Sequence, residues 1–271
     1  MAEPVNRTPR RDVPKLELHL SYACDIDCVA CTRASFLKKP HTRNLTLDDV
    51  EYAFAQCDEM KYEARVIIIG GEPTLHPHFY EICRRAVAWS INHQPDNFVQ
   101  VFSNGHSETA RMWCDRVRTE LNCSIFTDEW KPERRVGGEV GKPEWHFNTF
   151  VSPADAGLPN QGPCYQHSSI ICGIGYDAHG FTLCPMGGTI STLLGAPEGV
   201  IRSRRLADLF DPEWAKRATE EMCKHCGYAI WNRLGTPDEK GAHDRYSDVQ
   251  PLGQAGTRMS PTWQAAFAGR K

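Results

Sequence analysis

The sequence contains no long apolar run. No stretch approaches the roughly 20 consecutive apolar residues of a membrane-spanning helix. The first segment, MAEPVNRTPRRDVP, lacks the apolar region of a signal peptide. Residues 1–14 are therefore expected to be a flexible lead-in, and the sequence predicts a cytoplasmic protein with no membrane partner.

An excess of either charge is also missing. The chain has 31 basic and 34 acidic residues, which leaves no electrostatic footprint for nucleic acid. With 41% hydrophobic and 24% charged residues in a chain of 271, it can bury a sizeable globular core. We therefore expect a small-molecule or peptide substrate and no nucleic-acid partner.

Cysteine, by contrast, is abundant. In a reducing compartment, twelve cysteines are expected to be metal ligands or buried thiols rather than disulfides. Four fall inside helix-like or strand-like patterns and are expected to be small core side chains: Cys57, Cys83, Cys114 and Cys123. The other eight form two groups, within 24–31 and 164–226. Metal chemistry is therefore expected in these two groups.

Strand-like and helix-like segments alternate along the first half of the chain. The expected strands are KLELHLSYA (15–23), RVIIIGGEP (65–73), NFVQVFSNG (97–105) and CSIFT (123–127). The expected helices are 46–60, 79–92 and 107–121, the first with a capping pattern at Thr46 and Asp49. This order predicts an α/β fold built as a full or partial barrel. In such folds, functional groups collect where the strands end.

The second half of the chain has a different pattern. A loop-rich connection over 128–158 precedes SSIICGIGYDAHGFTLCPMGG (168–188), which is expected to form a β-hairpin around DAHG with a turn at CPMGG. A charged helix over 204–222 then leads into CKHC. The tail after Trp231 is polar and is expected to be irregular.

The first cysteine group follows the first expected strand with the spacing C-x3-C-x2-C. Cys24, Cys28 and Cys31 supply three ligands, one fewer than a closed tetrahedral zinc site uses. A disulfide would leave one thiol over. A [4Fe-4S] cluster held by three cysteines keeps one iron open for a small chelating ligand. We therefore favour the cluster over a structural zinc or a disulfide.

Together with GGEP and SNG at the ends of the next two expected strands, this loop resembles the radical S-adenosylmethionine (SAM) superfamily. The resemblance implies a partial (β/α)6-type radical SAM barrel. It also implies that Cys24, Cys28 and Cys31 hold the cluster and that SAM chelates its open iron. The residues that it assigns to SAM are Gly70, Gly71, Glu72 and Pro73, with Ser103 and Asn104 at the ribose or carboxylate. An electron donor such as flavodoxin or ferredoxin is the implied partner.

The second group contains Cys164, Cys172, Cys184, Cys223 and Cys226. A hairpin turn at Gly180, then a cysteine, a helix and C-x2-C resemble the auxiliary-cluster domain called twitch, related to SPASM. This implies a second [4Fe-4S] cluster on all of these thiols except Cys172, although structural zinc suits the ligand type equally. Cys172 is then a buried thiol or, as in radical SAM epimerases, a hydrogen donor.

These resemblances divide the chain into 1–14, a radical SAM core over 15–155, a twitch/SPASM-like domain over 156–232 and a polar tail over 233–271. A single auxiliary cluster resembles the butirosin-type aminocyclitol dehydrogenase, which implies oxidation of a natural-product or sugar-like alcohol. The alternatives are a neomycin-type epimerase that uses Cys172, a ribosomal-peptide-modifying enzyme, and an iron-sulfur or zinc binding regulator without catalysis.

Overall fold

The fold is given by a computed structural model. The structure describes residues 14–26, 31–34, 43–93, 99–127, 150, 152, 154–155, 173–227 and 260–268. In these ranges no helix is both long enough and apolar enough to cross a membrane.

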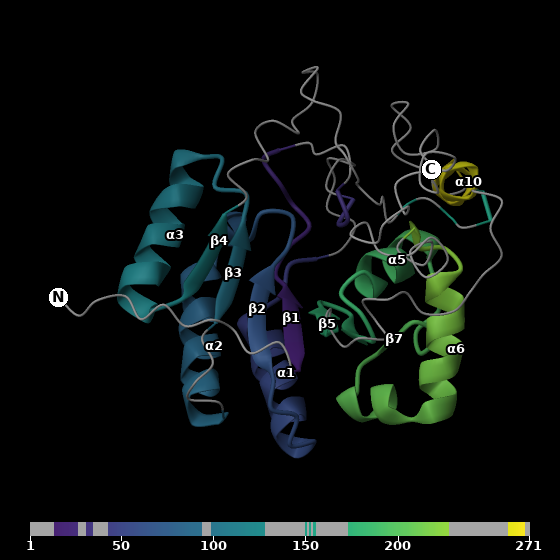
Figure 1. Cartoon of the computed structure of the whole chain (residues 1–271), viewed down its shortest axis with the longest axis horizontal. Coiled ribbons are helices and arrows are strands. Elements are labelled where there is room, and N and C mark those ends of the chain that lie inside the picture. The colour runs from purple at the N-terminus through teal and green to yellow at the C-terminus, as the bar shows by residue number, and fades with distance from the viewer. Residues whose placement is uncertain are drawn as a thin grey trace, which may run out of the picture.

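A seven-stranded sheet in the order β4-β3-β2-β1-β5-β6-β7 forms the centre of the molecule (Figure 1). Its strands are β1 (Lys15–His19), β2 (Arg65–Ile69), β3 (Gln100–Ser103), β4 (Ser124–Thr127), β5 (Ile174–Asp177), β6 (Gly180–Thr182) and β7 (Arg202–Ser203). Strands β1 to β5 pair in parallel, whereas β6 and β7 are antiparallel. The predicted α/β class is confirmed, and the parallel part is consistent with a partial barrel.

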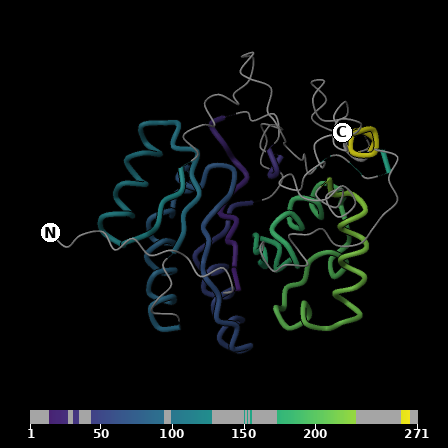
Figure 2. The backbone as a smooth tube through the Cα atoms, viewed as in Figure 1, coloured from purple at the N-terminus to yellow at the C-terminus, as the bar shows by residue number. Residues whose placement is uncertain are grey.

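The hairpin continues this sheet. Strand β5 pairs with β1 on the side opposite to β2, with Leu18 against Tyr176 in β5 and Ile68 in β2. In Figure 2, β1 (purple) lies between the blue and teal segment that follows it in the chain and the green segment of the second half of the chain. The cysteine loop that follows β1 therefore starts near the middle of the sheet.

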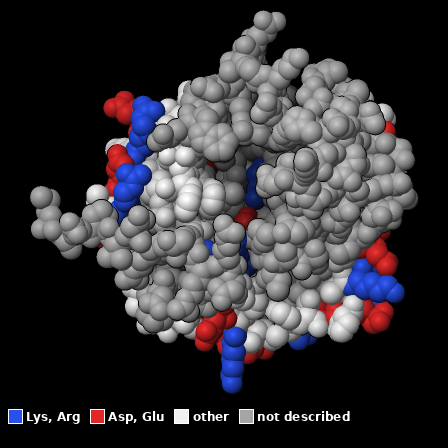
Figure 3. All heavy atoms as spheres, viewed as in Figure 1, with Lys and Arg blue, Asp and Glu red and all other residues white. Residues whose placement is uncertain are grey.

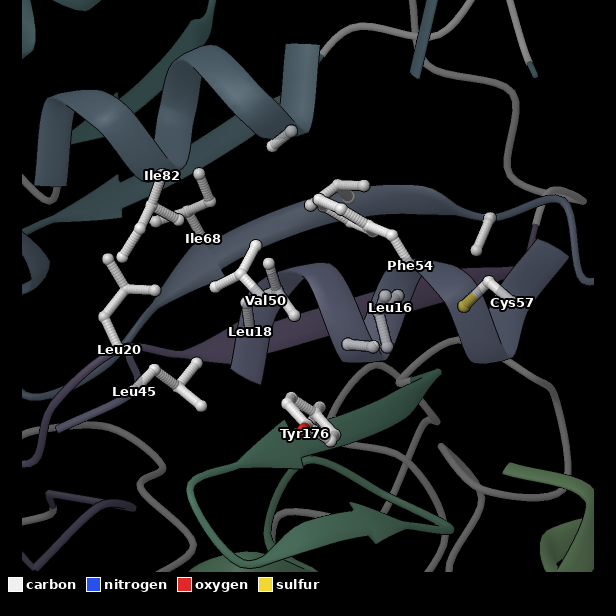
Figure 4. Packing of buried hydrophobic residues seen from close by; sticks show 14 of the residues in the cluster. Leu16, Leu18, Leu20, Leu45, Val50, Phe54, Cys57, Ile68, Ile82 and Tyr176 are labelled. Atoms are coloured by element: carbon white, nitrogen blue, oxygen red, sulfur yellow. The ribbon is translucent and has the colours of Figure 1, made fainter. Parts of the chain in front are cut away.

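Three helices cover one face of the sheet: α1 (Leu47–Glu59), α2 (Phe79–His93) and α3 (Glu108–Leu121). Leu16, Leu18 and Leu20 point to this face, and they pack with Val50 and Phe54 of α1 in the main core (Figure 4). The predicted capping pattern is confirmed, because Asp49 N donates to Thr46 Oγ1 while Thr46 N donates to the Asp49 carboxylate.

A second, smaller core lies among α5 (Gly187–Leu194), α6 (Pro212–Cys223) and α10 (Pro261–Ala268). One sequence expectation is wrong here, and another is confirmed only in part. The helix expected over 204–222 is divided into a 3-10 helix, η4 (Leu206–Phe210), and α6, because Asp211 caps α6 and Pro212 occupies its first position. The turn expected at CPMGG is present at Pro185 and Met186, where Gly187 N donates to Cys184 O at 2.9 Å, but its GG already belongs to α5.

The tail, expected to be irregular, contains α10. Trp263 is fully buried in the second core, and its indole Nε1 donates to His225 O at 2.8 Å. Ser260 N donates to Phe150 O at 2.9 Å. The C-terminal segment is thus packed against the loop that carries Cys223 and Cys226.

Candidate active site

The cysteine loop runs close beside GGEP. A Cβ on Gly70 would lie 2.3 Å from Ser21 O, and one on Gly71 would lie 2.2 Å from Ala23 O. Only glycine allows the two backbones to approach this closely. The two glycines therefore hold GGEP against the segment that leads into Cys24.

Glu72 joins the ends of β2 and β3. Its side chain is fully buried, and its Oε1 accepts hydrogen bonds from Thr74 N at 3.1 Å, Thr74 Oγ1 at 2.7 Å and Ser103 Oγ at 2.9 Å. Its Oε2 accepts from Asn104 N at 2.7 Å. The carboxylate thus fixes SNG relative to GGEP.

Asn104 connects SNG to the cysteine loop. Its Nδ2 donates to Asp25 Oδ1 at 2.6 Å and lies 3.7 Å from Cys24 Sγ, while its Oδ1 accepts from His106 N at 2.7 Å. The structure therefore brings Cys24, Glu72 and Asn104 together from three strand ends, as the motif positions predict. Pro73 follows Glu72 as the first residue of a short 3-10 helix, η2 (Pro73–Leu75).

The donor set here suits an iron-sulfur cluster. Cys24 and Cys31 are partly exposed, and Cys28 lies outside the described residues. Burial raises the pKa of Cys24 to about 12, and nearby Cys31 adds to the shift. Thiolate is the usual ligand of iron-sulfur clusters, so binding of a cluster would have to displace this proton. The residues described fit the group that the motif predicts.

Three thiols of the second group share the second core. Cys184, Cys223 and Cys226 are all buried there, and Met186 N lies 3.3 Å from Cys184 Sγ. Cys164 and Cys172 lie outside the described residues, so their roles stay predictions. Within the described part of the chain, no three His, Cys, Asp or Glu side chains form a site for a metal ion.

Sequence reasoning missed one polar group beside these motifs. Glu17 and His19 alternate with the leucines of β1 and so point to the face opposite α1 and α2. Arg33, which follows the cysteine loop, places Nη2 at 3.2 Å from Glu17 Oε2. The alternation in KLELHL could have revealed this group, because it places the Glu17 carboxyl and the His19 imidazole on the same face of the strand.

Arg33 also reaches the second cysteine group. Its Nη1 donates to Pro185 O at 3.1 Å and lies 3.2 Å from Met186 Sδ, directly after Cys184. Its side chain is almost fully buried. One guanidinium therefore links the segment after Cys31 to the segment after Cys184.

Comparison with known proteins gives a family match for part of the chain. Residues 18–129 match the model of the radical SAM superfamily. No curated protein matches the chain. Among solved structures, BtrN in complex with AdoMet and 2-DOIA is similar, with a TM-score of 0.49, 12% identity, and coverage of 79% of this chain and 92% of that chain. BtrN in an open conformation gives a TM-score of 0.46 and 13% identity over the same shares.

Proposed function

We propose that this chain, whose residues 18–129 match the radical SAM superfamily, oxidises an alcohol-bearing carbon of a sugar-like or other natural-product substrate. In this proposal a [4Fe-4S] cluster on Cys24, Cys28 and Cys31 binds SAM and supplies the electron that yields a 5′-deoxyadenosyl radical. A second cluster on Cys164, Cys184, Cys223 and Cys226 is the proposed electron acceptor.

The convergence of Cys24, Glu72 and Asn104 is the observation that carries the proposal. The Asn104 amide lies against Cys24 Sγ, and its backbone N–H is held by Glu72. A hydrogen bond to a ligating sulfur orients the ligand and tunes a cluster. Three motifs from separate strand ends therefore form one arrangement suited to a cluster and its ligand.

The second core contains three of the proposed ligands of the electron acceptor. Cys184, Cys223 and Cys226 are buried together, away from the first cysteine loop in sequence, with Arg33 between the two groups. A fully ligated cluster cannot bind SAM, so its proposed work is to accept the electron that leaves the substrate radical. Epimerisation through Cys172 remains the alternative prediction.

Anaerobic reconstitution tests the proposal. The unsubstituted chain is expected to hold about eight irons, and Cys24→Ala and Cys223→Ala are each expected to lose about four, since each cluster contains four. Cys57→Ala, which removes a buried thiol of the main core, is the matched control and should keep all of the iron. The unsubstituted chain should also cleave SAM to 5′-deoxyadenosine under dithionite. Intact clusters without this cleavage would refute an enzyme, and zinc bound with unchanged iron in Cys223→Ala would refute the second cluster.

A further inference from the structure

The sheet presents one continuous row of side chains on the face away from α1 and α2. His19 pairs with Ile69 in register, and Phe102 pairs with Phe126. Phe102 follows Val101, the partner of Ile68, so these residues lie at one level across β1 to β4. This level lies at the strand ends from which the cysteine loop, GGEP and SNG emerge. The row therefore borders the proposed SAM site.

One end of the row is polar and buried. His19 is 2% exposed, and among the described residues neither of its ring nitrogens has a hydrogen-bond partner. Its Nε2 lies 3.7 Å from Glu17 Oε2, beyond hydrogen-bond reach. An imidazole buried without partners costs free energy unless a ligand supplies them. His19 therefore points to a ligand that can donate and accept hydrogen bonds.

The other end of the row is aromatic and open. Phe102 and Phe126 stack with centroids 4.9 Å apart, and they are 38% and 40% exposed. Two strand spacings, about 10 Å, separate β1 from β3. An apolar surface that ends in a few convergent polar groups is typical of a small-molecule site. It suits a ring with a C–H face and hydroxyl or amino groups at its edge.

The charges around Glu17 favour a proton acceptor. Burial raises the pKa of Glu17 to about 7, although Arg33 and Lys15 oppose the shift. Burial and the charge of Arg33 hold the pKa of His19 well below its usual range, so the ring is neutral. Asp177, the nearest acid on β5, is engaged by Arg202. A carboxyl group that titrates near neutrality is poised to take a proton.

Arg33 links this group to the segment after Cys184, a proposed ligand of the electron acceptor. Arg33 contacts Glu17 with Nη2 and Pro185 O with Nη1, and Pro185 follows Cys184. In Figure 3, a few basic and acidic atoms are visible near the middle of the view. The proton and the electron would therefore leave the substrate on the same side.

We propose that Glu17, His19 and Arg33 form the substrate-binding and proton-accepting group for a cyclic polyol or amino polyol. His19 hydrogen-bonds the hydroxyl of the reacting carbon, Glu17 accepts its proton, Arg33 positions Glu17, and the ring packs on Phe102 and Phe126. This inference rests on the proposed function.

The step balances as follows. Bound SAM, once cleaved, would supply the 5′-deoxyadenosyl group that takes the hydrogen atom of the C–H bond, which would leave 5′-deoxyadenosine and a substrate radical that still bears its hydroxyl. When the O–H bond breaks, Glu17 would accept the proton, and an auxiliary cluster on the second cysteine group would accept the one electron. The carbon–oxygen double bond of a ketone remains.

The probes for a first experiment are ring-deuterated D-glucose, D-glucosamine and myo-inositol, incubated with the reconstituted holoenzyme, SAM and dithionite. We expect the unsubstituted chain to transfer deuterium from at least one probe to 5′-deoxyadenosine and to form the matching ketone. Absence of SAM cleavage would overturn the proposed function together with this inference. SAM cleavage without deuterium transfer from any probe would overturn the inference alone.

Two variants then separate binding from proton removal. Glu17→Gln should lower the ketone formed per deuterium transferred at least roughly 100-fold and should abolish the rise of ketone formation between about pH 6 and 8. Glu17→Asp, which keeps a carboxylate, should recover part of this ratio. His19→Ala should weaken binding of the reactive probe at least roughly tenfold in equilibrium dialysis.

Exposed Glu63→Gln and His78→Ala are the matched controls, and neither should change these quantities. Iron content and the visible spectrum of each variant check that it is folded and loaded. A wild-type ketone-to-deuterium ratio in Glu17→Gln, or wild-type binding in His19→Ala, would overturn the proposal.

Discussion

At the residue scale, Glu72 is a motif residue whose carboxylate is bound by hydrogen bonds from other residues of the chain. Its carboxylate accepts four hydrogen bonds, from Thr74, Ser103 and Asn104, without exposure to solvent. The acid of GGEP thus fixes the relative positions of two strand ends. Its role at SAM stays a prediction, and the contacts described are with the chain itself.

Replacing Glu72 should therefore destabilise the fold. Glu72→Ala leaves buried donors unpaired, and we expect a loss of about 3 kcal/mol. This corresponds to a fall of roughly 6 °C or more in Tm, measured by differential scanning fluorimetry of the holoenzyme. Glu63→Ala, at an exposed position, should shift Tm little. Equal melting of the two variants would show that the buried network contributes no stability.

At the scale of elements, the sequence predicted the helices and strands whose sequence patterns lie within a single segment of the chain. The capping pattern at Thr46 and the apolar periodicity of α1 lie within one segment, as do the ends of β2 and β3. The pairing of β5 with β1 depends on strands far apart in sequence, which no local pattern encodes. Gly187 and Gly188 resemble a turn, yet tertiary packing makes them the start of α5.

The residues of the candidate site also divide into those that local sequence patterns reveal and those that only the tertiary structure reveals. Cys24, Glu72 and Asn104 could be found because motif residues at parallel strand ends converge. The contacts of Arg33 with Glu17 and Pro185 could not be predicted, because they depend on where the hairpin lies relative to the cysteine loop.

The N-terminus of α1 allows a test at this scale through pH. Burial opposes ionisation of Asp49, but hydrogen bonds from Arg43 and Thr46 prevail and lower its pKa to about 2. A depressed pKa stabilises the fold above the unfolded value, about 3.9, and this stability disappears as pH falls through 2. Asp49→Asn should thus lower Tm near pH 7, and the difference should shrink towards pH 2. Asp115→Asn, at an exposed position on α3, is the comparison. A difference that is constant with pH would exclude the charge of Asp49 as the cause.

At the scale of the whole molecule, the second core ties the C-terminal helix to the second cysteine group. Trp263 of α10 is fully buried, and it donates to His225 between Cys223 and Cys226. The packing of a distant segment thus supports the loop that carries two predicted cluster ligands.

Removal of this support should affect metal content. Trp263→Ala leaves a large cavity, at a cost of about 3–5 kcal/mol, beside the C-x2-C loop. We expect iron per reconstituted chain to fall from about eight to about four, since only one of two four-iron clusters would be lost. Phe210→Ala, at an exposed aromatic position, should retain its iron. Full iron in a folded Trp263→Ala protein would separate α10 from the second cluster.

The central place of β1 has a consequence for biosynthesis. Its partner β2 is translated soon after it, whereas its partner β5 emerges only after β4. During that interval the nascent chain exposes an unpaired edge of β1, a template for wrong pairing with other chains. A chain truncated after β4 would thus keep this edge open and be prone to aggregate.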